Sequence, residues 1–142
     1  MPVVLVLNRQ RRHAVSLKLL RCFANDLARH AKRKVGGFTV LLTTDRTIRR
    51  YNSYYRRHDE ATDVLSFPIE EPILPSLDNR YLGDMMISVE TAHRHGLEHN
   101  HSLEREIQIL MIHGWLHLMG LDHEVDQGQM RRKELRVQRE LL

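Results

Sequence analysis

Residues 102–123 read SLEREIQILMIHGWLHLMGLDH, and they contain the strongest structural signals in the sequence. Ser102 is a favoured residue type for the N-cap of a helix. After it, apolar residues such as Ile107 and Leu110 recur at the three- and four-residue spacing of one helix face. Gly120 is the residue type that most often ends a helix in the left-handed conformation. The stretch therefore predicts a long helix that packs an apolar face on the core and ends near Gly120.

The rest of the chain predicts an α+β fold around this helix. Alternating and β-branched patterns predict strands over residues 3–7, 38–43, 63–67 and 81–89. Helical spacing predicts helices over residues 16–34, 45–57 with Asp45 as N-cap, 91–101, and from about Asp126 to the C-terminus. Prolines predict a loop over residues 70–80. We expect one domain, residues 1–142, with a mixed sheet of about four strands covered by helices.

Composition and charge narrow the class of protein. The chain has 142 residues, 42% of them hydrophobic and 28% charged, which is typical of one soluble globular domain. No apolar run approaches the roughly 20 residues of a membrane span, and we expect a cytoplasmic protein. Cys22 is expected on the apolar side of its helix. The net charge of +4 fits a nucleic-acid partner without proving one, although the basic residues are mostly arginine, which suits phosphate contacts.

Three histidines at the end of the long helix have the spacing of a metal site. His113 and His117 are four residues apart, so they lie one turn apart on the same helix face. A reversal at Gly120 would bring His123 back towards them. Ligands at relative positions 0, 4 and 10 with glycine at 7 have the spacing of the HExxHxxGxxH zinc peptidases. We expect one divalent ion there, with zinc as the best match.

The site differs from those peptidases at one position. Gly114 stands where they carry the glutamate that acts as general base, so a peptidase mechanism is disfavoured. Three neutral imidazoles would leave the full charge on the ion and a coordination position open for water or substrate. Two alternatives are three independently hydrogen-bonded histidines and a structural metal site. A structural site normally completes four protein ligands.

Asp122 and the histidines of residues 93–101 are weaker candidates for metal-site residues. Asp122 either accepts a hydrogen bond from a metal-binding histidine or is only a turn residue. His95 and His99 also have the four-residue spacing, and His93 and His101 are nearby. That segment is polar on several faces and offers no third ligand from a turn, so we expect a solvated helix and connection rather than a second metal site.

A second motif, NSYYRRHDEATDVLSFP, occupies residues 52–68. Together with LGDMMIS at residues 82–88 and the histidine segment, it closely resembles the YbeY family of bacterial rRNA maturation factors, which are metal-dependent, single-strand-specific endoribonucleases. The resemblance covers about residues 52–135, with three motifs in order. It implies an α+β fold, a zinc ion at the end of a positively charged cleft, and roles in 16S rRNA 3′-end maturation and ribosome quality control.

The resemblance also implies roles for individual residues. The zinc ligands of the family correspond to His113, His117 and His123. Its functionally important arginine corresponds to Arg56, and a glutamate two helical turns before the first ligand corresponds to Glu106. At about 10 Å along the helix axis, Glu106 is expected to pack or hydrogen-bond rather than to bind the same ion. One departure is Ala61, where the family usually has proline.

The residues around Arg56 support a role in phosphodiester chemistry by themselves. A metal and an arginine together can neutralise the charge that develops on a phosphoryl group during cleavage. Neighbouring arginines are expected to form a phosphate-binding surface, or alternatively a merely solvated basic face: Arg49, Arg50 and Arg57. The interleaved tyrosines could stack on bases or belong to the core: Tyr51, Tyr54 and Tyr55.

These observations favour a zinc-dependent endoribonuclease that acts on single-stranded RNA, with 16S rRNA and the small ribosomal subunit as its partners. One alternative is a ribosome-assembly RNA-binding factor in which a metal mainly stabilises the fold. A zinc peptidase is the other alternative, and Gly114 argues against it.

Overall fold

The computed structural model of the chain describes residues 3–30, 36–69, 81–121 and 126–142. Within these residues the chain forms four strands and five helices, in the order β1 Val4–Asn8, α1 Leu17–His30, β2 Phe38–Thr43, α2 Asp45–Arg56, β3 Val64–Pro68, β4 Gly83–Ser88, α3 Val89–His99, α4 Leu103–Leu118 and α5 Gln129–Leu141. The α+β class expected from the sequence is confirmed. The expected loop over residues 70–80 lies outside the described residues.

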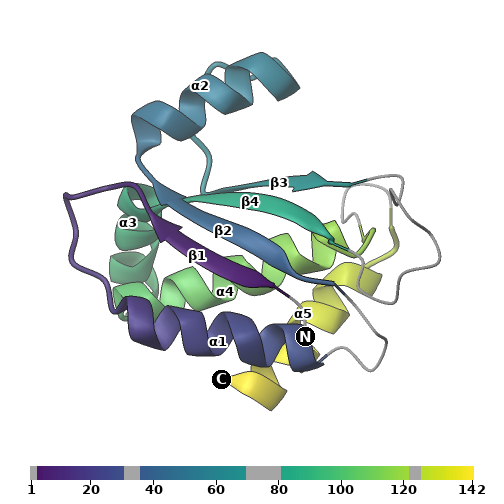
Figure 1. Cartoon of the computed structure of the whole chain (residues 1–142). Helices are drawn as coiled ribbons and strands as arrows, with labels where there is room; N and C mark the ends of the chain where they lie inside the picture. Colours follow the sequence, from purple (N-terminus) through teal and green to yellow (C-terminus); the bar gives the residue numbers. More distant parts are fainter. Residues whose placement is uncertain (1–2, 31–35, 70–80, 122–125) are drawn as a thin grey trace.

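The four strands form one mixed sheet in the order β1-β2-β4-β3 (Figure 1). β1 pairs with β2 and β2 with β4 in parallel, whereas β3 runs antiparallel to β4 at the sheet edge. Parallel neighbours need crossover connections, and α1 provides the one from β1 to β2, whereas the one from β2 to β4 consists of α2 and β3. The expected mixed sheet of four strands is therefore confirmed.

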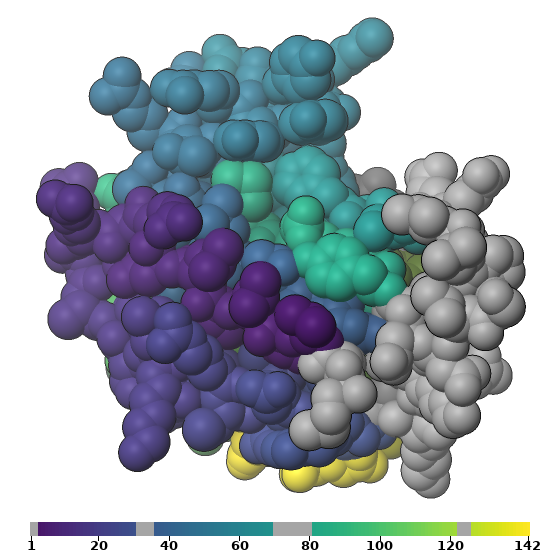
Figure 2. Space-filling view, viewed as in Figure 1, coloured from purple at the N-terminus to yellow at the C-terminus, as the bar shows by residue number. Residues whose placement is uncertain are grey.

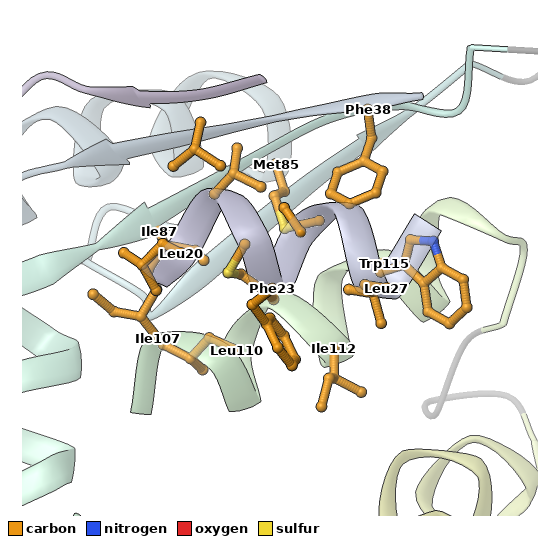
Figure 3. Close-up of a cluster of buried hydrophobic side chains, with 14 of the residues drawn as sticks. Leu20, Phe23, Leu27, Phe38, Met85, Ile87, Ile107, Leu110, Ile112 and Trp115 are labelled. Carbon is orange, nitrogen blue, oxygen red and sulfur yellow. The ribbon is translucent and has the colours of Figure 1, made fainter. Parts of the chain in front are cut away.

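One face of the sheet, which we call the core face, is covered by α1 and α4. Val6, Val40 and Met85 stand side by side on neighbouring strands and belong to one large cluster of buried side chains. Figure 3 shows Phe38 and Met85 projecting from the sheet towards this cluster, which also contains Leu20 of α1. Burial of so much apolar surface is the main stabilising contribution to a fold of this size.

The opposite face, which we call the outer face, carries α2 and a smaller core. The alternation of strand side chains places Leu41 and Met86 here, opposite to Val40 and Met85. Met86 packs with Leu65 of β3 and with Ile48 of α2. Figure 2 shows α2 at the top of the molecule, with side chains of β3 and β4 open to view beneath it. The outer face is thus only partly covered.

A hydrogen-bond network fixes α2 to the start of α3. Asp45 Oδ1 accepts hydrogen bonds from Ser88 Oγ at 2.5 Å and Thr91 Oγ1 at 2.6 Å. Arg94 Nη2 lies 3.0 Å from Asp45 Oδ2. Burial acts to raise the pKa of Asp45, but the hydrogen bonds from these three residues outweigh it and lower the pKa below its ordinary value. The ionised carboxylate is therefore the state that holds α2 in place.

Several local expectations differ from the structure. The N-cap of α2 is Thr44, whose side chain accepts from Thr47 N, so Asp45 is the first helical residue. The Asp45 side chain does not act as the cap because it accepts hydrogen bonds from Ser88 and Thr91 instead. α3 begins at Val89 because Ser88 caps it.

Cys22 is exposed rather than in the core. No described helix is long and apolar enough to cross a membrane.

Candidate metal centre

The long helix expected from residues 102–123 is α4, and both of its ends are capped as the sequence indicates. Ser102 accepts a hydrogen bond from Arg105 N at 3.1 Å. At the other end, Gly120 N donates to His117 O and Leu121 N donates to Leu116 O, at 3.0 and 3.1 Å. Gly120 has φ 95°, the left-handed conformation that this cap requires. The helix therefore ends within three residues of His117.

His113 and His117 lie together on the last turns of α4. Their ring centroids are 4.8 Å apart, and the ring planes meet at 64°. The side chain of His113 is 27% exposed, so the pair is accessible from solvent. Two imidazoles one helical turn apart can bind the same ion. His123, the expected third ligand, and Asp122 lie outside the described residues.

A carboxylate of α5 forms a hydrogen bond with the Nδ1 atom of His113. Glu134 Oε1 is hydrogen-bonded to His113 Nδ1, and Arg131 Nη1 lies 3.2 Å from Glu134 Oε2. Burial acts to raise the pKa of Glu134, but the hydrogen bond and charge of His113, with those of Arg131, lower it below its ordinary value. An ionised carboxylate can only accept, so His113 Nδ1 donates to Glu134, and Nε2 is the ring nitrogen that the neutral imidazole would offer to a metal.

Gly114 has a packing reason that the sequence alone does not reveal. A Cβ at this position would lie 2.8 Å from Met85 Sδ and 3.3 Å from Ser66 Oγ. Ser66 Oγ also donates to Gly114 O at 3.3 Å. Position 114 thus faces β3 and β4, and a side chain larger than hydrogen here would require its neighbours on these strands to shift.

Arg56 and its neighbours lie on α2, on the other side of the sheet. Arg56 is the last residue of α2, and Arg57 is the C-cap with φ 59°. Arg49 is already paired with Asp59, at 2.9 Å from Nε to Oδ1 and 3.2 Å from Nη2 to Oδ2. The structure therefore brings His113 and His117 together on α4, whereas Figure 1 shows α2, which carries the arginines, on the opposite face of the sheet.

The tyrosines of α2 form an exposed aromatic surface rather than core. Tyr51, Tyr54 and Tyr55 are 40%, 78% and 60% exposed. The rings of Tyr51 and Tyr55 are parallel to within 11°, and Phe67 of β3 meets Tyr55 edge-on at 5.3 Å between centroids. A cleft of about 420 Å³ opens between these rings and the outer face of the sheet. Its lining is mainly aromatic and aliphatic, with Asp84 as the charged residue.

The comparison with known proteins agrees with this architecture. The family model for endoribonuclease YbeY matches residues 6–141. The chain belongs to the endoribonuclease YbeY family. The match covers both the histidine segment of α4 and the aromatic surface of α2, so both features lie within the part of the chain that the family shares.

Individual relatives support the same assignment. Endoribonuclease YbeY of Nautilia profundicola is 45% identical over 102 residues, which are 72% of this chain and 70% of that protein. The protein of the same name from Heliobacterium modesticaldum is 45% identical over 111 residues, 71% of this chain and 67% of that protein. The solution structure of TM1509 from Thermotoga maritima superposes with a TM-score of 0.65 at 26% identity, covering 98% of this chain and 89% of that one.

In this YbeY-family chain, Glu134 contacts the candidate site but was not predicted from the sequence. It lies on the buried side of α5 with Met130 and Val137, at the spacing of an apolar helix face. A charged residue on an otherwise apolar stripe is rarely buried without a partner. That pattern could have identified Glu134, but only the packing of α5 on α4 shows that the partner is His113.

Proposed function

We propose that this chain is a zinc-dependent endoribonuclease that cleaves single-stranded RNA. The observation that carries the proposal is the histidine pair of α4, with His113 fixed by Glu134 so that its Nε2 faces away from the carboxylate. Its membership of the endoribonuclease YbeY family supports the same activity. We further propose 16S rRNA as the substrate, with 3′-end maturation and quality control on the small ribosomal subunit in the cytoplasm as the setting.

The donor set fits the proposed ion. His113 and His117 would supply two imidazole nitrogens, and we propose His123 as the third ligand and Asp122 as an outer hydrogen-bond partner. Neutral imidazole suits zinc, and the hydrogen bond from His113 Nδ1 to a carboxylate is the usual outer support of such a ligand. A bound dipositive ion would supply Lewis-acid stabilisation of charge on a phosphoryl oxygen.

Other residues of the chain would position the metal ligand on one side of the sheet and bind RNA on the other. Glu134 keeps the His113 ring in one orientation. On the outer face, Tyr55 offers an exposed ring for base stacking, and Arg50 and Arg57 are candidates for phosphate contacts. Arg56 stands at the end of α2 on that face. We propose that it contributes to cleavage through the phosphate backbone of an RNA strand that passes over the β3 edge towards the histidines.

The proposal is tested by cleavage of a defined single-stranded RNA, with the matching duplex as comparison. His117→Ala should lower the cleavage rate at least about a hundredfold, because several kcal/mol of metal stabilisation is lost. His58→Ala is the matched control, since His58 is an exposed histidine in the turn after α2. Cleavage that survives His117→Ala in preparations free of contaminating nuclease would reject the proposed activity.

A second pair of variants tests the role of Arg56. Arg56→Ala should weaken cleavage of the same RNA, whereas Arg136→Ala should not, because Arg136 is an exposed arginine on α5. If the purified chain bound the RNA without cleaving it, while zinc removal lowered the melting temperature, the chain would instead be an RNA-binding assembly factor with a structural metal.

A further inference from the structure

Two histidines and a glutamate come together where α3 meets α4, at the opposite end of α4 from the proposed catalytic centre. His99 is the last residue of α3, His101 lies in the connection, and Glu106 lies in the first turns of α4. Their potential ligand atoms all lie within 4.8 Å of one another. The sequence shows no third ligand from a turn near these histidines. The structure supplies it from the next helix.

The local backbone explains why these three side chains meet. Asn100 caps α3 in the left-handed conformation, with φ 57°, and His101 N donates to Gly96 O at 2.8 Å. A Cβ at Gly96 would lie 3.0 Å from His101 O and 3.7 Å from Glu106 Cβ. The glycine therefore allows the connection and the start of α4 to pack closely against α3, which brings Glu106 to both histidines.

Two of the distances are close to those between the ligands of one small ion. Glu106 Oε2 lies 3.0 Å from His101 Nδ1, and Glu106 Oε1 lies 3.4 Å from His99 Nδ1. Ligands at about 2.0–2.1 Å from a tetrahedral zinc are separated by about 3.3 Å. His99 has the most exposed side chain of the three, at 55%, so it can adjust to an ion and solvent can occupy the remaining position.

The charge balance at Glu106 favours a cation. Its side chain is only 5% exposed. Within the described residues, the salt-bridge partners of Glu106 are the two imidazoles, and no lysine or arginine is paired with it. An imidazole neutralises a carboxylate only when it carries its second proton, whereas a dipositive ion bound to neutral imidazoles also does so at neutral pH.

We propose that His99, His101 and Glu106 form a second binding site for a divalent transition metal of the zinc class, separate from the site at His113 and His117. Glu106 and His113 are seven residues apart on α4, so the two sites are separated by about 10 Å along the helix axis. The second ion would join the end of α3 to the start of α4. Its role is structural, and it is independent of RNA cleavage.

The test is the zinc stoichiometry of purified chain after equilibrium dialysis, measured by elemental analysis. Wild-type chain should bind about two zinc ions, and the His113→Ala/His117→Ala double variant should keep about one. Adding His99→Ala to that double variant should remove the remaining ion, and adding His58→Ala, a change at another exposed histidine, should not. Zinc binding that is unchanged by His99→Ala would overturn the proposal.

A second measurement covers the case in which the double variant does not fold. In otherwise wild-type chain, zinc should raise the melting temperature by binding the folded state, and His101→Ala should remove a distinct part of that rise. RNA cleavage by His101→Ala should remain near the wild-type rate at a temperature where both proteins are folded. An identical zinc-induced rise in wild-type and His101→Ala chain would also refute the second site.

Discussion

The two faces of the sheet differ in how completely they are covered and in what they carry. The core face is buried under α1 and α4 and has the histidine pair at its rim, where α4 ends. The outer face has a small core under α2 and leaves tyrosines and arginines exposed. The difference suits two separate tasks. A rigid, buried face can orient metal ligands, and an open face can bind a flexible RNA strand.

The largest effect is expected where α4 touches the core face. Gly114→Glu would force a carboxylate against Met85 Sδ, which lies 2.8 Å from an ideal Cβ, and we expect loss of cooperative folding by circular dichroism. Gln108→Glu places the same side chain at a partly exposed position of α4 and should fold. A folded Gly114→Glu chain with wild-type melting temperature would show that the close approach of helix and sheet is unimportant.

The next effect concerns the rim of the core face. Glu134→Gln keeps the shape of the side chain but removes the charge that supports His113, so zinc affinity should fall about 10- to 100-fold. The measurement is competition with a chelator in a His99→Ala background, which isolates the proposed catalytic ion. Glu140→Gln, which alters a carboxylate paired with His30 elsewhere on α5, is the control. Equal affinities in the two variants would mean that Glu134 does not position the ligand.

A smaller effect is expected on the outer face. Tyr55→Ala removes a 60% exposed ring, and loss of one base-stacking contact should weaken single-stranded RNA binding about 5- to 150-fold. Fluorescence anisotropy in the His117→Ala background measures binding without cleavage. Leu97→Ala removes an exposed apolar side chain from α3 and should have no effect. Unchanged binding by Tyr55→Ala would place the RNA elsewhere.

The smallest effect concerns the attachment of α2. The folded-state pKa of Asp45 lies below its ordinary value of 3.8, so its stabilisation is complete above that pH and is lost as the pH falls through the folded-state pKa. Asp45→Asn should therefore lower the melting temperature at pH 7, and the gap to wild type should narrow below about pH 4. Asp26→Asn, at an exposed ion pair on α1, should show little change. A gap that is constant with pH would contradict the role of the ionised carboxylate.

Much of the fold follows from local patterns in the sequence. The extent of α4, its Ser102 cap and its reversal at Gly120 all depend on residues within a few positions of one another. The same is true of the proximity of His113 and His117, because four-residue spacing on a helix guarantees it. The zinc ion and the third ligand His123 remain predictions.

Other features required the packing of distant segments. Glu134 is 21 residues from His113, and Arg56 is placed across the sheet by the crossover between β2 and β3. Periodicity identified the amphipathic helix that contains Cys22, but the orientation of that helix on the sheet exposes the thiol. In each case the short-range pattern was compatible with more than one tertiary neighbour.

The α+β class, the long helix and its histidine pair could be predicted from residue patterns, because helix periodicity and capping act over only a few residues. Three features became visible only in the packed molecule: Glu134 supports His113, Gly114 lies against Met85, and Glu106 meets two histidines from α3 and its connection. These contacts depend on how helices pack against one another and against the sheet, and side-chain spacing along a single helix does not specify that packing.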